Sequence, residues 1–247
     1  MKKNFCLFTI FLFAFSSVSM AWHDPTDGKP FFPWAWEDQL KPTLKKSVDG
    51  KGVTLLAVGT GLTFTTRIYD HKIHDSNNED GILMGKEDAA YWGKLGNGVI
   101  GMSLALTQLA FDQSNGLKTV RTLLLATTSQ TAISAVARRN RPDNRTDFLP
   151  WPSAFPSGHA TSAYALAGSL AYSYGWPVGV PAYAVASAIG IARIREARHW
   201  ASDVVAGATI GTFWARASFK ADENPDTAMI VPVPVDDGLM LMAVKDW

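Results

Sequence analysis

Long uninterrupted apolar stretches are the main feature of this sequence, and each is as long as a helix. Five of them are rich in Ala and Leu, at residues 52–66, 95–111, 119–137, 160–194 and 200–217. Runs of this length are longer than ordinary strands and predict helices. The fourth is interrupted by Gly175-Trp176-Pro177, a break that ends one helix and begins the next. The pattern therefore predicts an all-α bundle of about six helices.

Other segments lack this pattern. Residues 22–50 begin with Pro, Trp and Phe in no regular order, which indicates an irregular N-terminal arm held by aromatic side chains. The polar segment 70–86 is expected to be an exposed loop. We therefore place the helical domain at residues 51–220 and a separate tail at residues 221–247.

The tail carries the signal of a β-hairpin. Two apolar runs, MIVPVPV and LMLMAVK, flank Asp236-Asp237-Gly238, and Asp-Gly between apolar runs is a strong hairpin signal. Pro232 and Pro234 cannot donate a backbone hydrogen bond, so we expect the first strand to lie at an edge. A C-terminal hairpin is therefore predicted.

Residues 1–21 have the features of a targeting segment. Lys2 and Lys3 precede an apolar run that is followed by small polar residues ending at Ala21. This order predicts a secretory signal peptide and a protein exported to the periplasm. An uncleaved anchor is the alternative, although the run is shorter than the ~20 residues of a membrane span. The single cysteine, Cys6, lies here, so a mature chain would have no disulfide, cysteine metal site or cysteine nucleophile.

Charge spacing bears on whether the helices cross a bilayer. The uncharged stretches at the first, second, third and last apolar runs are 15, 17, 16 and 12 residues long, each below the ~20 that a span requires. Residues 160–192 carry no charge, but the break at Gly175 divides them. We expect a helical globular domain. Contact with a membrane surface and a membrane-embedded bundle stay open as alternatives.

Charge balance excludes one class of partner. The chain has 23 Lys and Arg against 22 Asp and Glu, a formal net charge of +1, and no strongly basic block. Binding to a nucleic-acid backbone needs clustered cations. We therefore expect no nucleic-acid partner.

Polar residues suited to chemistry gather in three segments beside the helices. They are Arg141-Pro142, Pro156-Ser157-Gly158-His159, and Arg193 followed by His199 and Asp203. His199 and Asp203 are four residues apart, so on a helix they share a face and the carboxylate can accept an imidazole N–H. That pairing fixes the tautomer and leaves the other ring nitrogen free as a nucleophile.

The remaining residues of these segments favour an anion. Ser157 stands like an N-cap before a helical run, and Gly158 offers an unobstructed backbone N–H at a helix N-terminus, where anions bind. Arg141 and Arg193 supply planar, multidentate donors that suit a phosphoryl group. Arg-Pro alone is uninformative, and a His and an Asp four residues apart are more often a surface pair or a capping detail, so the conjunction of the three segments is much stronger evidence than any one of them.

In this order, R-P, P-S-G-H and R-x5-H-x3-D, the segments resemble the three-part signature of the type 2 phosphatidic acid phosphatase (PAP2) superfamily, which also includes bacterial class A acid phosphatases and vanadium haloperoxidases. The family's all-helical bundle agrees with the predicted helices. The resemblance implies that His199 attacks phosphorus and forms a phosphohistidine. It implies that Asp203 orients His199 and that His159 protonates the leaving oxygen.

The resemblance also implies how phosphate is held. Arg141, Arg193, and the backbone N–H groups of Ser157 and Gly158 would bind the non-bridging oxygens. Ala192 stands where the family's third motif normally has Ser before the Arg, which is a minor departure.

The first motif departs more. The family normally has Lys seven residues before the Arg of Arg-Pro, and here that position is Ser134. If the helix over residues 119–137 continues to Arg139, Arg138 lies one turn from Ser134 and can supply the missing positive charge. The alternative is that Arg138 is a solvated residue that interacts with the helix C-terminus.

The sequence thus predicts an exported, metal-independent phosphatase without a cofactor, acting on phosphomonoesters or lipid phosphates. Rival readings are an integral-membrane phosphatase of phosphatidate or polyprenyl pyrophosphate, a vanadate-dependent haloperoxidase, and a degenerate phosphate-binding envelope protein, the last motivated by Ser134. His71 and His74 suggest a metal site only weakly, because their spacing in an acidic segment is more typical of plain surface.

Overall fold

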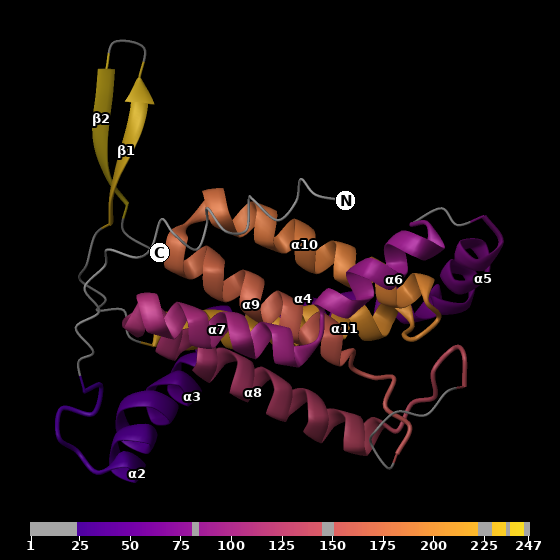
Figure 1. The fold of residues 1–247 in the computed structure, drawn as a ribbon, viewed down its shortest axis with the longest axis horizontal. Coiled ribbons are helices and arrows are strands. Elements are labelled where there is room, and N and C mark those ends of the chain that lie inside the picture. The colour runs from indigo at the N-terminus through magenta and orange to yellow at the C-terminus, as the bar shows by residue number, and fades with distance from the viewer. Residues whose placement is uncertain (1–23, 81–83, 145–150, 222–228, 236–237, 245–247) are drawn as a thin grey trace, which may run out of the picture.

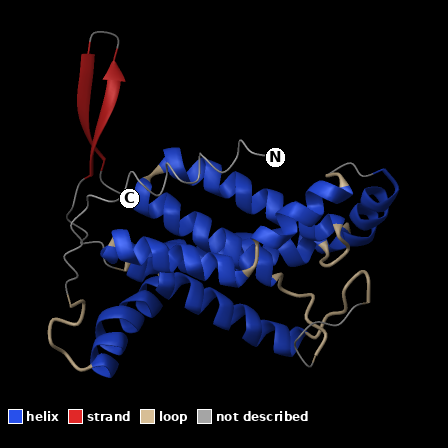
Figure 2. Ribbon diagram, in the orientation of Figure 1, coloured by secondary structure: helices blue, strands red, loops and turns tan. Residues whose placement is uncertain are grey.

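Helices occupy the stretches where the apolar runs predict them (Figure 1). The computed structural model describes residues 24–80, 84–144, 151–221, 229–235 and 238–244. The long helices within this part are α4 (Gly50–Ile68), α7 (Gly98–Phe111), α8 (Gln113–Ala137), α9 (Gly158–Tyr174), α10 (Trp176–Arg195) and α11 (Ala201–Lys220). Figure 2 shows them as one bundle joined by loops. The predicted all-α class and its six principal helices are confirmed.

Local chemistry explains two of the helix boundaries. Gly175 has a φ of 75°, a conformation that favours glycine, and it ends α9. Pro177 then lies in the first turn of α10, where a missing N–H costs nothing. At the start of α4 the carboxylate of Asp49 accepts a hydrogen bond of 2.7 Å from the backbone N–H of Gly52.

The centre of the bundle is the packing of α9 against α11. A Cβ on Gly207 would lie 2.6 Å from the carbonyl oxygen of Ser157, and one on Gly211 would lie 2.5 Å from that of Thr161. Only glycine permits so close an approach of the two backbones. Helix α8 packs against both α9 and α11, while α10 packs against α9 and α4 packs against α11. This close packing brings the start of α9 beside the start of α11.

The N-terminal arm is more regular than expected. After Pro30 the chain forms α2 (Phe31–Pro33), a π-helical segment η1 (Trp34–Leu40) and α3 (Lys41–Ser47). The prediction of an irregular arm is therefore wrong for residues 31–47, because proline at the start of a helix favours it rather than breaking it.

The polar segment after α4 is also helical, which corrects the predicted loop. Helix α5 (Asp70–Asp80) follows α4 directly, and α6 (Lys86–Leu95) begins after residues 81–83. Composition hides α5 because its buried residues, Asp70 and Asn77, are polar. Polar contacts of Asn77 with the last turn of α10, together with packing of the partly buried Ile73 against core residues, stabilise this helix.

The predicted hairpin is confirmed. Strands β1 (Met229–Val235) and β2 (Gly238–Val244) pair antiparallel, with Val235 opposite Gly238. The turn residues Asp236 and Asp237, and the predicted signal peptide at residues 1–21, lie outside the described residues.

Candidate active site

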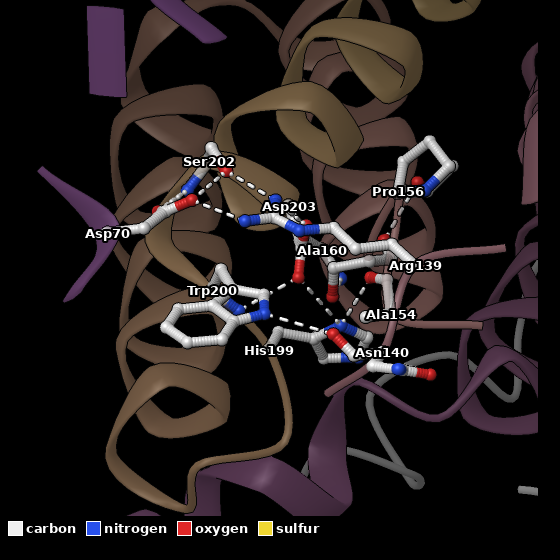
Figure 3. A network of polar contacts seen from close by, with 12 residues as sticks. Asp70, Arg139, Asn140, Ala154, Pro156, Ala160, His199, Trp200, Ser202 and Asp203 are labelled. Carbon is white, nitrogen blue, oxygen red and sulfur yellow. Dashed lines mark hydrogen bonds and ion pairs between the residues drawn. The ribbon is translucent and has the colours of Figure 1, made fainter. Parts of the chain in front are cut away.

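Backbone hydrogen bonds join the three polar segments into one site. The N–H of Ala154 donates to the carbonyl oxygen of Arg139 at 3.0 Å, and the N–H of Asp143 donates to that of Ala197 at 3.2 Å. The indole Nε1 of Trp200 donates to the carbonyl oxygen of Asn140 at 3.0 Å (Figure 3). The segment after α8, the segment before α9 and the loop from α10 to α11 thus meet at the same end of the bundle.

His199 lies in the loop before α11 and is 2% exposed. Its Nδ1 is 2.7 Å from the carbonyl oxygen of Ala154 and 3.9 Å from Oδ2 of Asp203. Because a carbonyl oxygen only accepts, Nδ1 carries the proton and Nε2 keeps its lone pair. The tautomer expected from the sequence is therefore obtained, but the expected partner is wrong: the acceptor is the Ala154 carbonyl oxygen, and His199 is not on the helix that holds Asp203.

The electrostatic surroundings of His199 favour the neutral imidazole. Burial lowers the pKa of His199 well below its ordinary value of 6.5, and the positive charges of Arg141 and Arg193 and the His159 ring lower it further. The hydrogen bond to Ala154 opposes this shift. The same residues that lower this pKa are those expected to bind phosphate, which indicates that the structure brings them together around His199.

Asp203 is fully buried in the first turn of α11 and caps that helix. Its Oδ2 accepts a hydrogen bond of 2.8 Å from the backbone N–H of Trp200, and its Oδ1 accepts one of 2.6 Å from Nη1 of Arg139. Burial raises the pKa of Asp203 to about 7, and the charge of Arg139 opposes that rise. The carboxylate is therefore held between the loop of His199 and the partly buried Arg139.

The segment from Pro156 to His159 forms the start of α9, as expected. The Oγ of Ser157 accepts from the backbone N–H of Ala160 at 3.4 Å, and Gly158 is the first helical residue. However, the N–H of Ser157 donates to the carbonyl oxygen of Asp203 at 3.0 Å. This bond corrects the expectation that the Ser157 N–H holds a phosphate oxygen, since its proton is already bonded within the protein. The N–H of Gly158 begins the helix, where the helix itself supplies no acceptor.

A charged cleft opens at His159 and Arg193. It has a volume of about 350 Å³, and its lining includes His159, Arg193, Glu196 and Arg198. Arg141 and Arg193 are both largely buried, and Nη1 of Arg193 lies 2.5 Å from Oε2 of Glu196. The cleft therefore presents cationic groups and a half-buried imidazole to an anionic ligand.

The structure does not bring Arg138 into this cluster. Helix α8 ends at Ala137, and Arg138 caps it in the left-handed conformation with a φ of 44°. The exposed Arg138 donates from Nε to the carbonyl oxygen of Ala135 at 3.0 Å. The expectation that the helix continues to Arg139 is wrong, and Arg138 interacts with the helix C-terminus instead. Ser134 is fully buried, with the indole Nε1 of Trp151 3.3 Å from its Oγ.

Sequence reasoning missed Arg139, Asp70 and Ser202, which form hydrogen bonds around Asp203 (Figure 3). An arginine two residues before Arg-Pro gave a weak signal, whereas nothing in the polar segment marked Asp70 as buried. The rings of His71 and His74 pack against Trp200, at centroid distances of 4.8 and 5.5 Å. Among the described residues no group of three or more His, Cys, Asp or Glu side chains is arranged to hold a metal ion.

Comparisons with known proteins find similar sequences and a similar fold. Residues 115–225 match the model of the PAP2 superfamily. A stretch of 63 residues is 46% identical to a lipid A 1-phosphatase of Porphyromonas gingivalis, covering 24% of this chain and 14% of that protein. The chain thus matches only about a seventh of that relative's length.

Two solved structures are similar in fold. The crystal structure of Aquifex aeolicus LpxE has a TM-score of 0.50 and 23% identity, covering 55% of this chain and 85% of that one. A transmembrane PAP2-type phosphatidylglycerolphosphate phosphatase from Bacillus subtilis has a TM-score of 0.49 and 20% identity, covering 66% of this chain and 90% of that one. At these identities the first likeness shows the fold alone, which is the arrangement of helices described above.

Proposed function

We propose that this chain, whose residues 115–225 match the model of the PAP2 superfamily, is a phosphoric ester hydrolase that acts on lipid phosphates through a phosphohistidine at His199. The observation that carries this proposal is the buried His199, whose Nδ1–H is held by Ala154 while Arg141 and Arg193 lie close enough to lower its pKa. A neutral, oriented imidazole beside two guanidinium groups suits attack on a phosphoryl group.

The reaction has two steps. Nε2 of His199 forms a bond to phosphorus as the phosphorus–oxygen bond of the ester breaks, and His159 gives its proton to the leaving alcohol. A water molecule then attacks the phosphohistidine and passes a proton to His159, which releases inorganic phosphate and restores both histidines. His159 thus acts as acid and then as base.

Charge stabilisation accounts for most of the catalysis in this scheme. Arg141 and Arg193 bind the non-bridging oxygens, and the N–H of Gly158 adds a donor at the start of α9. Asp203 stabilises the positive charge that His199 gains on phosphorylation. No step requires a metal ion.

An apolar groove supports a lipid rather than a soluble ester. It lies between α7, α9 and α10, has a volume of about 270 Å³, and its lining includes Ile100, Leu166 and Ile189. Asn97 lines both this groove and the charged cleft, and a Cβ on Gly96 would lie 3.1 Å from Cβ of His159. An acyl chain in the groove would therefore have its phosphate end beside the proposed acid.

Exposed apolar side chains support action at a membrane. They lie along four helices: Val53, Leu56, Val58, Leu62, Phe64 and Ile68 on α4; Val99, Ile100, Leu104, Leu106 and Phe111 on α7; Leu124, Ile133 and Val136 on α8; Trp176, Val178, Val180 and Val185 on α10. Soluble monomers rarely expose apolar surface on this scale. Among the described helices α10 is long and apolar enough to cross a membrane by length and composition. These observations favour the membrane-embedded alternative, with export of the chain by residues 1–21 retained as part of the proposal.

The proposal is tested by the substrate preference of the purified full chain in detergent micelles. Hydrolysis of phosphatidic acid, a polyprenyl pyrophosphate and the 1-phosphate of lipid A is compared with that of a soluble aryl phosphate, each with and without EDTA. We expect a higher kcat/KM for at least one lipid and little effect of EDTA. A preference for the soluble ester would refute the lipid assignment, and strong reversible inhibition by EDTA would refute the metal-free mechanism.

Ser134 favours a second candidate, a phosphate-binding protein without turnover. The position that normally holds lysine in this family is filled by a buried serine in contact with Trp151. Binding of inorganic phosphate without hydrolysis of any ester would support this candidate over the enzyme.

A further inference from the structure

A largely buried ionic cluster surrounds Asp203, and none of its members lines the ligand cleft. Nη1 of Arg139 is 2.6 Å from Oδ1 of Asp203, and Nη2 of Arg139 is 2.7 Å from Oδ2 of Asp70 (Figure 3). One guanidinium thus joins two carboxylates, and both carboxylates are almost completely buried. Asp70 is the first residue of α5 and lies outside the three motif segments, far from them in the sequence.

Ser202 ties this cluster to the start of α11. Its Oγ donates to Oδ2 of Asp70 at 2.6 Å and accepts from Nη1 of Arg139 at 2.8 Å, while its backbone N–H donates to Oδ1 of Asp70 at 2.9 Å. Asp70 therefore fixes both the arginine and the first turn of the helix that presents Asp203. The guanidinium of Arg139 also lies 5.4 Å from the ring of Trp200, the residue after His199.

We propose that Asp70 and Arg139 are positioning residues: Asp70 holds the Arg139 guanidinium in place, and Arg139 holds the Asp203 carboxylate beside His199. The inference rests on the proposed phosphatase function. Burial and the charge of Asp70 raise the pKa of Asp203, and the Arg139 guanidinium lowers it, so Arg139 favours the carboxylate form that suits the positive charge His199 gains on phosphorylation. Neither residue lines the ligand cleft, so the effect acts on the chemical step rather than on substrate binding.

The distance between Asp203 and His199 shows why the charge of Asp203 matters. Asp203 lies 3.9 Å from Nδ1 of His199, too far for a hydrogen bond. Its influence is therefore mainly electrostatic, and it depends on the charge that Arg139 stabilises. An interaction of this kind falls when the charge is lost even if the side chain stays in place.

The test is the pair Asp70→Asn and Asp75→Asn, both on α5. Asp70 is buried in the cluster, whereas Asp75 is exposed and serves as the matched control. For Asp70→Asn we expect kcat per folded enzyme to fall at least about tenfold with KM within about twofold, because a stabilising effect on the transition state alone is lost. Asp75→Asn should match the wild type. The folded fraction is measured by circular dichroism at the assay temperature.

A purely structural role predicts a different result. Asp70→Asn would then lower the unfolding temperature while kcat per folded enzyme stayed unchanged, and that outcome would overturn the proposal. If Asp70→Asn does not fold, Ser202→Ala removes the hydroxyl that joins Asp70 to Arg139. A fall in kcat at constant KM supports the proposal, and unchanged kinetics overturns it.

Failure of the inference is separable from failure of the proposed function. If the wild type hydrolyses no phosphate ester, both are refuted. If His199→Ala abolishes wild-type turnover while Asp70→Asn behaves like Asp75→Asn, the inference alone is refuted.

Discussion

Blocking the apolar groove should separate lipid substrates from soluble ones. Ala182 is half-buried on α10 and lines the groove, whereas Ala184, two residues further on, is exposed outside it. Ala182→Trp places an indole in a space of about 270 Å³ that would otherwise take an acyl chain. Ala184→Trp adds the same side chain to the same helix and leaves the groove open.

The expected loss of kcat/KM follows from the apolar contacts that the acyl chain of the lipid can no longer make. Each buried methylene is worth about 0.8 kcal/mol, so exclusion of roughly three of them costs about 2.4 kcal/mol, or about 50-fold in kcat/KM. The assay measures kcat/KM for phosphatidic acid and for a soluble aryl phosphate with the wild type and both variants. Ala182→Trp should lose activity on the lipid and keep it on the aryl phosphate, while Ala184→Trp should change neither. An equal loss on both substrates, or no loss on the lipid, would refute the assignment of the groove to the acyl chain.

Three further predictions concern the site and its packing. The acid limb of the kcat/KM profile should lie below pH 6.5, because His199 must be neutral to attack and its pKa is lowered. Arg141→Gln removes a positive charge near His199, so the pKa of His199 should rise and the acid limb should move to higher pH. An acid limb that does not move on the same substrate would contradict its assignment to His199. Arg138→Ala should leave kcat/KM within about twofold of the wild type, because its guanidinium binds Ala135 at the helix end; a tenfold fall would instead assign Arg138 to the phosphate. Gly207→Ala should lower the free energy of unfolding by about 1–3 kcal/mol in denaturant, because the new Cβ would lie 2.6 Å from the Ser157 carbonyl oxygen. An unchanged unfolding midpoint would show that α9 and α11 can separate freely.

The sequence predicted the parts of the fold that rest on long-range apolar pattern and on local turn chemistry. The six principal helices, the break at Gly175 and the hairpin all follow from such signals. Helix α5 could not be predicted in this way, because its buried residues are polar and its stability depends on contacts with the last turn of α10. A window of sequence contains no information about such distant partners.

In the site too, some features could be predicted from the sequence and others could not. The three polar segments were found from residue types and order, and the structure brings them together. The acceptor for His199 was missed because a backbone carbonyl, that of Ala154, leaves no mark on the sequence. The role of the Ser157 N–H was misjudged for the same reason, since its acceptor is the carbonyl oxygen of Asp203. Arg138 and Arg139 are adjacent, and only the left-handed turn at Arg138 decides which of them enters the site.

The central claim is that His199 carries the phosphoryl group, and trapping that intermediate tests it most directly. The purified protein is mixed with a lipid substrate labelled on phosphorus, quenched in alkaline denaturant within a single turnover, and digested for mass spectrometry. The proposed mechanism predicts one phosphorylated peptide, with phosphate on His199 that is stable to base, is lost in acid, and is absent from His199→Ala. Phosphate trapped on any other residue, or turnover that persists in His199→Ala, would contradict the claim.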